Sequence, residues 1–300
     1  MFFTLPGKIF FIVTLKRRKY YINKLYLPAF KKWGIAVNIK PQLATSTRPS
    51  GGNFAEAVEF AQVHGFQGID WNLDCSRLPA STAARSLFYE QALGSGLVSR
   101  FHAPCQDVEI GHKNKMFSDT AVEYLKMYIE FLKDFPQAYL TLHIGSRSIP
   151  EDELSWDNAV GNLTKLVDFG GERGVTVCLE NLKRGWTSEP EKMASLVEKS
   201  GAMVTLDTGH ARGSRRILDG LDTLESFIQP FSQRIRNIHL YEIETADGRH
   251  HEPENLDNLR TVLNWALSSG INWWVIELTS YDQMLRCKKL LDREFSPVTS

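Results

Sequence analysis

The chain of 300 residues is longer than a typical domain of about 100–200 residues, but it suits one α/β barrel of about 250 residues with an extension. The composition, 43% hydrophobic and 23% charged, excludes a mainly disordered or collagen-like protein. The net charge is zero, yet the first 33 residues hold eight basic side chains and no acidic one. The rest of the chain is therefore acidic, with 27 basic against 35 acidic side chains, which argues against a general nucleic-acid-binding protein.

Residues 1–33 predict a basic N-terminal extension without stable order. The apolar run Ile9–Leu15 is shorter than the roughly 20 residues that span a bilayer, and basic residues follow it instead of preceding it. We therefore expect neither a membrane span nor a signal peptide. The alternative is that the cluster Lys16–Lys19 contacts anionic lipid or nucleic acid.

From residue 34 to 295 the pattern alternates between short apolar runs and amphipathic stretches of helical period, which predicts eight βα units. The predicted strands are Ile35–Ile39, Gly68–Leu73, Leu97–His102, Tyr139–His143, Val175–Glu180, Val204–Asp207, Ile235–Leu240 and Trp273–Leu278. The predicted helices are Phe54–Val63, Ser81–Leu93, Asp119–Leu132, Ser155–Phe169, Pro190–Val197, Leu221–Ile228, Leu256–Leu267 and Tyr281–Leu291.

Eight such units indicate a single (β/α)8 TIM barrel over residues 34–295, after the basic extension 1–33. The competing fold is a doubly wound open sheet, which usually has a glycine-rich phosphate turn after its first strand. Here the first predicted strand continues into Lys40-Pro41-Gln42, and no GxGxxG or GxxxxGK[ST] motif occurs in the sequence.

The cysteines point to a reducing compartment. They lie far apart and form no CxxC pair, which argues against a disulfide scaffold or a thiolate zinc finger. We therefore expect a cytoplasmic protein. The four positions are Cys75, Cys105, Cys178 and Cys287.

Side chains that bind metals stand where the predicted strands end, and this end of a TIM barrel carries the active site. Six of the eight histidines fall at or near these positions. The strand-end and loop residues are His102, His143, Glu180, Asp207, His210, His239, His250, His251 and Glu277.

Buried carboxylates that face one another repel unless a cation neutralises them. Glu180, Asp207, His239 and Glu277 would supply three oxygens and one nitrogen to such a cation. This mixed set suits one divalent ion, Mn2+, Mg2+, Co2+ or Zn2+, with open positions for substrate oxygens. The sequence thus predicts a metal enzyme that stabilises an enediolate or alkoxide while a carboxylate moves a proton.

Short motifs in a fixed order resemble the xylose isomerase-like TIM-barrel superfamily, which includes sugar phosphate isomerases/epimerases and endonuclease IV-type apurinic endonucleases. The resemblance covers about residues 34–292. The motifs are Phe66-Gln67-Gly68-Ile69-Asp70, His102-Ala103-Pro104, Leu142-His143-Ile144-Gly145, Leu179-Glu180-Asn181, Leu206-Asp207-Thr208-Gly209-His210, Ile238-His239-Leu240 and Val275-Ile276-Glu277.

The epimerase branch implies roles for these residues. Glu180, Asp207, His239 and Glu277 look like its metal ligands, and Glu180 and Glu277 also resemble its acid/base pair, one removing a proton from a bound ketose and the other returning it. By the same resemblance, His210 contacts the substrate, and His102 and His143 line the pocket.

The endonuclease branch implies a cluster of three zinc ions instead of one ion. Its Asp-x-His pair after the seventh strand is incomplete here, because the position two residues before His250 is Gly248 and that before His251 is Arg249. The departure puts a complete three-zinc cluster in doubt. The register of His250 against His251 stays open, with His250 taken as the substrate-binding residue.

The first hypothesis is a divalent-metal-dependent isomerase or epimerase of a sugar, sugar phosphate or related polyol. Arg215, after the sixth strand, is expected to bind a phosphate or carboxylate of that substrate. The alternatives are a zinc-dependent apurinic phosphodiesterase, a polyol dehydratase or hydrolase on the same barrel, and a barrel without catalytic activity. We expect a small-molecule partner and no nucleic acid or membrane; the oligomeric state is left open.

Overall fold

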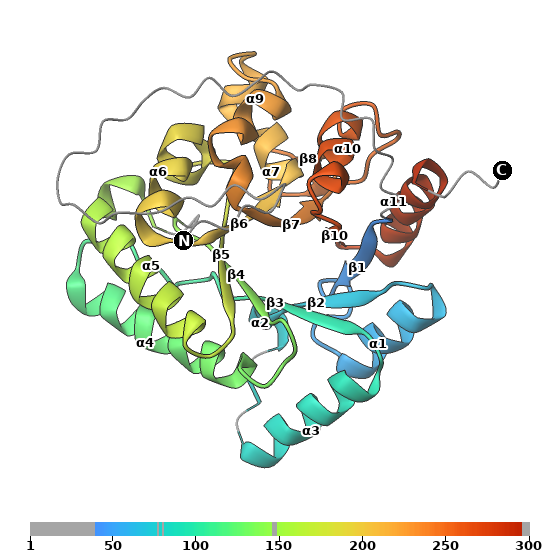
Figure 1. Ribbon diagram of the computed structural model, residues 1–300, viewed down its shortest axis with the longest axis horizontal. Coiled ribbons are helices and arrows are strands. Elements are labelled where there is room, and N and C mark those ends of the chain that lie inside the picture. Colours follow the sequence, from blue (N-terminus) through green and yellow to red (C-terminus); the bar gives the residue numbers. More distant parts are fainter. Residues whose placement is uncertain (1–39, 77, 80, 146–148, 296–300) are drawn as a thin grey trace, which may run out of the picture. The chain divides into compact units, whose positions relative to one another are not determined.

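The computed structural model describes residues 40–295 except 77, 80 and 146–148. Eight parallel strands form a closed barrel in the order β1-β10-β7-β6-β5-β4-β3-β2 (Figure 1). The predicted TIM-barrel fold is thus confirmed. The strands are β1 Gln42–Ser46, β2 Gly68–Asn72, β3 Val98–His102, β4 Tyr139–Leu142, β5 Thr176–Glu180, β6 Met203–Asp207, β7 Ile235–Leu240 and β10 Trp273–Ile276.

Helices surround the barrel and cover the outer faces of its strands (Figure 1). The major ones are α1 Phe54–Val63, α3 Thr82–Gly94, α4 Lys115–Leu132, α5 Trp156–Gly171, α6 Pro190–Ser200, α9 Leu224–Ile228, α10 Arg260–Ser268 and α11 Tyr281–Glu294. Side chains cap several of their N-termini; the Asn53 side chain, for example, accepts from the backbone N–H of Glu56 at the start of α1. All eight predicted helices are present, with bounds shifted by a few residues at most ends.

Shorter elements lie in the loops and were not predicted. Most follow the carboxyl ends of strands, so they help to shape that side of the barrel. They are α2 Leu73–Ser76, α7 Thr208–Gly213, α8 Arg215–Leu218, the 3-10 turns Glu151–Glu153, Trp186–Ser188 and Gln229–Arg234, and the antiparallel pair β8 Ile243–Glu244 and β9 His250–His251.

The prediction of the first strand at 35–39 is wrong, because β1 is Gln42–Ser46, which pairs with β2 and β10. Residues 35–39 themselves, like the predicted extension 1–33, lie outside the described residues. The error has a physical cause: β1 reads QLATS, and its small and polar residues are less apolar than the run before it. Those residues suit a strand whose inner face meets a crowded barrel interior.

The barrel interior is filled in layers. Near the amino ends of the strands, the Arg100 guanidinium lies over the rings of Tyr139 and Trp273, 3.8 and 4.5 Å from their centres. In the next layer the Thr141 and Thr205 hydroxyls are 2.7 Å apart, although they come from the non-adjacent strands β4 and β6. Since side chains alternate along a strand, the residues two positions further on also face inward.

This alternation brings the predicted site residues to the carboxyl end of the barrel. Asp207 is two residues after Thr205, and Glu277 is four residues after Trp273. The inner layers are close-packed; a Cβ on Gly68 would lie 2.3 Å from the Trp273 ring, so a glycine is required there. The barrel is therefore a solid support for a site at one end, not a channel.

Two general properties concern the described part of the chain. None of its helices combines the length and the apolar character needed to cross a membrane. Cys105, Cys178 and Cys287 are free thiols.

Candidate metal centre

Four side chains converge at the carboxyl end of the barrel. Glu180, Asp207 and His239 lie at or near the ends of β5, β6 and β7, and Glu277 directly follows β10. Each can offer one ligand atom, and these four atoms all lie within 4.8 Å of one another. All four side chains are buried. The structure thus brings together the four residues that the sequence predicted as ligands.

Local hydrogen bonds fix two of these strand ends. The Asn181 side chain accepts from the backbone N–H of Asp207 and donates to the Asp207 carbonyl, at 2.9 and 2.8 Å. This amide continues the pairing of β5 with β6 past the end of the ladder. Asp207 is also the N-cap of α7, because its Oδ1 accepts from the backbone N–H of His210 at 2.6 Å.

Two of the carboxylates use one oxygen and leave the other without a hydrogen bond. Asp207 Oδ1 caps α7, and Glu277 Oε1 pairs with Arg48 at 2.7 Å. Within the described part of the chain, Asp207 Oδ2, Glu277 Oε2 and Glu180 Oε2 are buried and have no hydrogen-bond partner. Buried acceptors of this kind are costly unless something satisfies them. A divalent cation would satisfy all three oxygens, so the residues present fit a metal ion.

His239 supplies the nitrogen of this set. Its Nδ1 lies 3.2 Å from Glu180 Oε2 and 3.0 Å from Glu277 Oε2. On the other side of the ring, Nε2 faces Asp70 Oδ2 at 3.8 Å. A carboxylate behind the imidazole is the usual way to orient a metal-binding histidine. Asp70, on β2, ends the motif Phe66-Gln67-Gly68-Ile69-Asp70, but the sequence predicted no role for it in the site.

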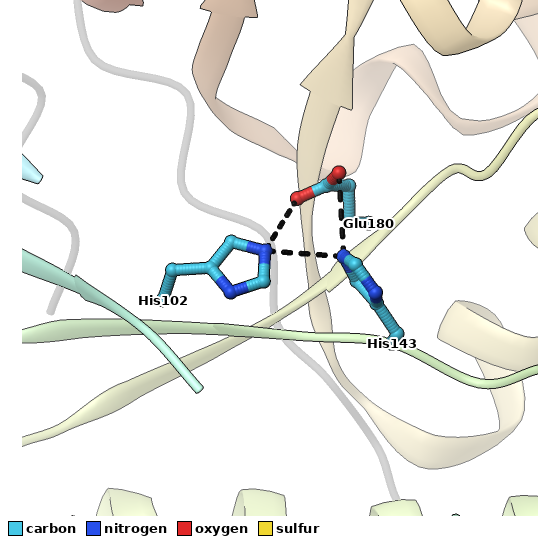
Figure 2. Close-up of side chains that lie close together, drawn as sticks. All are labelled: His102, His143 and Glu180. Carbon is cyan, nitrogen blue, oxygen red and sulfur yellow. Dashed lines mark hydrogen bonds and ion pairs between the residues drawn. The ribbon is translucent and has the colours of Figure 1, made fainter. Parts of the chain in front are cut away.

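A second group of ligand-type atoms shares Glu180. His102 Nε2 and His143 Nε2 are 3.1 Å apart, and each lies 3.4 Å from an oxygen of Glu180 (Figure 2). The Nδ1 of His102 donates to the Ala103 carbonyl at 2.8 Å, so in the neutral ring the lone pair is on Nε2, the nitrogen that faces His143 and Glu180. These three side chains also meet the spacing for a metal site.

The electrostatics of the centre favour ionised glutamates. Burial alone would raise the pKa of Glu180, but the charges of His239 and His143 outweigh it and hold the pKa well below the usual value. For Glu277, Arg48 and His239 outweigh burial in the same direction and lower its pKa. Burial together with the charges of Glu180 and Glu277 raises the pKa of Asp207 to about 7, against the opposing charge of His210.

His210 lies between the four-residue cluster and the loop after β7. Its Nδ1 donates to the Asn181 carbonyl at 3.0 Å and is 3.3 Å from Glu180 Oε1. Its Nε2 is 3.2 Å from Glu244 Oε2, and Lys183 Nζ lies 3.6 Å from the other oxygen of Glu244. The sequence predicted His210 here but not Glu244, because a two-residue strand such as β8 leaves no periodic signal.

Of the two histidines after the seventh strand, His250 is the one that contacts residues of the site. His250 is buried, whereas His251 is exposed. Burial lowers the pKa of His250 to about 4, against the opposing charge of Glu277, so the ring is neutral at pH 7. Its Nδ1 donates to the Glu277 carbonyl at 2.8 Å, and its ring stacks on that of Tyr241 with centroids 3.8 Å apart.

The sequence also missed Arg48, the residue that pairs with Glu277. Arg48 follows β1, whereas the first strand was predicted at 35–39. The predicted strand end was therefore next to Lys40 and not next to Arg48. The predicted substrate-binding residue Arg215 lies elsewhere, on α8. Its side chain is 92% exposed and is 3.8 Å from Asp219, and no described contact joins it to the cluster. Its role in substrate binding stays a prediction.

A closed parallel barrel with histidines and carboxylates at the carboxyl ends of its strands defines a TIM-barrel protein with a candidate metal centre. The family model described as xylose isomerase-like TIM barrel matches residues 58–292. The chain therefore belongs to this family. An uncharacterized protein of Methanocaldococcus jannaschii is 29% identical over 191 residues, which is 64% of this chain and 77% of that protein.

Solved structures share the fold at lower identity. A D-tagatose 3-epimerase-like protein has a TM-score of 0.67 and 18% identity, covering 85% of this chain and 96% of its own. An IOLI protein solved with a binding zinc atom has a TM-score of 0.63 and 17% identity. The match covers 86% of this chain and 99% of the IOLI chain. Endonuclease IV from Thermus thermophilus has a TM-score of 0.59 and 20% identity, covering 85% and 98%. At these identities the likeness concerns the fold alone, and proteins with this fold include epimerases and an endonuclease.

Proposed function

We propose that the protein is a divalent-metal-dependent isomerase or epimerase of a sugar, sugar phosphate or related polyol. One observation carries the proposal: four buried ligand atoms lie within 4.8 Å, and three of the side chains that supply them keep a carboxylate oxygen without a hydrogen bond. Glu180, Asp207, His239 and Glu277 would hold the ion. When bound, it would polarise a carbonyl and hydroxyl pair of the substrate.

The two glutamates are suited to move protons. Both are buried with pKa values held well below the usual value, so both are bases at neutral pH. One would accept the proton from the carbon next to the substrate carbonyl. The other would first take up a proton from a substrate hydroxyl or water, and would then deliver it to the same carbon from the opposite side. Asp207 and His239 would mainly hold the ion, with Asp70 orienting His239.

The partly exposed side chains around the cluster would bind the substrate. His143 and His210 are 14% and 11% exposed and are placed to donate to or accept from substrate hydroxyls. His102 and His250, which are buried, would line the same pocket. The substrate is a small molecule in this proposal, and the cytoplasm is the expected location, which the three free thiols support.

The test is proton exchange in D2O. A panel of ketoses that includes D-tagatose and L-ribulose is incubated with the protein and Mn2+, Mg2+, Co2+ or Zn2+, and deuterium uptake next to the carbonyl is followed by NMR. Glu277→Gln should lower the exchange rate at least about 100-fold, the lower range for loss of a general acid–base group, with an unchanged circular dichroism spectrum. Glu130→Gln, on the outer surface, is the control. Normal turnover by Glu277→Gln would refute the role of this residue.

A second function is favoured by the group His102, His143 and Glu180. This group could hold a further ion next to the first, as a zinc-dependent apurinic phosphodiesterase would need. Nicking of a duplex with one abasic site, with zinc and without exchange into any ketose, would support this alternative. Loss of water or ring opening of a polyol without exchange would instead point to a dehydratase or hydrolase.

A further inference from the structure

Arg48 and Glu277 form an ion pair at the edge of the centre. Arg48 Nη2 lies 2.7 Å from Glu277 Oε1, and Arg48 Nη1 is 3.5 Å from His250 Nε2. The Arg48 side chain is 28% exposed, whereas Glu277 is 4% exposed. Arg48 thus reaches from the surface of the loop after β1 to a carboxylate inside the site.

This contact gives the two carboxylate oxygens of Glu277 different neighbours. Oε1 faces Arg48, and Oε2 faces His239 Nδ1 at 3.0 Å without a hydrogen bond in the described part of the chain. Oε2 is therefore the oxygen available to a cation in the cluster. A guanidinium keeps its charge at all ordinary pH values. Arg48 therefore places a permanent positive charge next to the site proposed for the divalent ion.

We propose that Arg48 is a positioning residue that competes with the divalent ion for Glu277. Resting on the metal centre proposed above, this means that Arg48 weakens metal binding and keeps Oε1 of Glu277 off the ion. The benefit is positional: Arg48 holds Oε1 of Glu277, so the carboxylate keeps one orientation while Oε2 faces the cluster. Arg48 thus lowers the metal affinity and fixes the carboxylate proposed to move the proton.

The neighbouring residues explain why an arginine stands at this position. Its planar group presents several N–H donors in a fixed arrangement, so it contacts Glu277 and the acceptor nitrogen of His250 together. The Nδ1 of His250 donates to the Glu277 backbone carbonyl at 2.8 Å. His250 therefore contacts both Arg48 and the backbone of Glu277. A lysine at position 48 could not contact Glu277 and His250 in the same planar arrangement.

The test is metal affinity, measured by titrating Mn2+ or Zn2+ into metal-free protein by calorimetry. Arg48→Met should bind the ion more tightly, by at least about tenfold, because a unit charge a few ångström from the ion is removed. Arg48→Lys should remain close to the wild type in affinity. In the ketose exchange assay, Arg48→Met should lower kcat, with a smaller change in KM.

Arg173→Met is a matched control. Arg173 is 26% exposed and pairs with Glu130 at 2.7 Å, so its exposure and its pairing distance match those of Arg48, but its contacts lie on α4 and α5. Its removal should leave metal affinity within about twofold of the wild type. If Arg48→Met does not fold, Arg48→Gln removes the same charge and carries the same expectation.

The outcomes separate this inference from the proposed function. If the wild type binds no divalent ion, the proposed metal enzyme fails. If the wild type binds the ion and the variants that remove the charge, Arg48→Met and Arg48→Gln, bind it equally or more weakly, the competition is refuted and the metal centre stands. Arg48 would then be a structural support for Glu277 only.

Discussion

Gly209 lies in the motif Asp207-Thr208-Gly209-His210, and its replacement by alanine tests how this motif shapes the site. A Cβ at Gly209 would lie 1.9 Å from Cε2 of Tyr241 and 2.3 Å from Cδ2. Ordinary carbon contacts begin near 3.4 Å, so the ring would have to move by about 1.5 Å. Tyr241 is fully buried and stacks on His250, so this movement has no free space.

The expected cost follows from overpacking of a rigid interior. Gly209→Ala should lower the free energy of unfolding by about 2–3 kcal/mol and the Tm by roughly 5–8 °C. Gly209 lies in the helix α7, where alanine is the better helix former, so propensity acts in the opposite direction. Gly161→Ala is the matched control: Gly161 lies in α5 with nothing near its Cβ position, and this change should stabilise by about 0.5–1 kcal/mol.

The assay is urea and thermal unfolding, with a double variant that isolates the clash. In a Tyr241→Ala background the ring is gone, so Gly209→Ala should have little further effect. The reasoning is refuted if Gly209→Ala is as stable as the wild type, or if its cost is the same in both backgrounds. Either result would mean that Tyr241 does not occupy the space above Gly209.

Three further predictions concern the metal and the buried acids. Chelation should lower the Tm of the wild type by several degrees, since an ion at 100 times its Kd contributes about 2.7 kcal/mol, and the Tm of His239→Ala should not respond. Asp70→Asn should weaken metal binding about 10–100-fold in a calorimetric titration, because Asp70 faces the rear nitrogen of His239; unchanged affinity would remove Asp70 from the site. Burial raises the pKa of Glu109, against hydrogen bonds from the N–H groups of Gly111 and Gly145, so its folded form favours the proton. Its contribution to stability is therefore full below the ordinary pKa of 4.5 and is lost as the pH rises through the raised pKa. In urea unfolding, the stability of Glu109→Gln should therefore increase relative to that of the wild type as the pH rises above about 4.5. A difference that stays constant with pH would contradict that assignment.

Most of the fold could be predicted because buried parallel strands are continuous apolar runs. This signal located β2 to β7 and β10, and it placed Glu180, Asp207, His239 and Glu277 at strand ends. The same signal failed for β1, whose sequence QLATS is small and polar. Arg48 was missed for the same reason, because site residues are predicted at strand ends and the true end of β1 was not predicted.

The loop after β7 could not be predicted for a different reason. Its two strands have two residues each, so neither alternation nor length marks them. Their pairing nevertheless brings Glu244 to His210, and His250 to Arg48. These contacts depend on the path of the loop in space, which local sequence does not encode. The limits 1–33 and 34–295 for extension and barrel stay predictions.

Metal content per chain is the measurement that tests the central claim most directly. The protein is purified without chelator and examined by elemental analysis, beside Glu180→Gln prepared in the same way. The account predicts about one divalent ion per chain in the wild type and its loss in the variant, because Glu180 belongs to the cluster of four ligand atoms. Two or three zinc ions would favour the phosphodiesterase instead. A wild type that binds no divalent ion, even after soaking, would contradict the account.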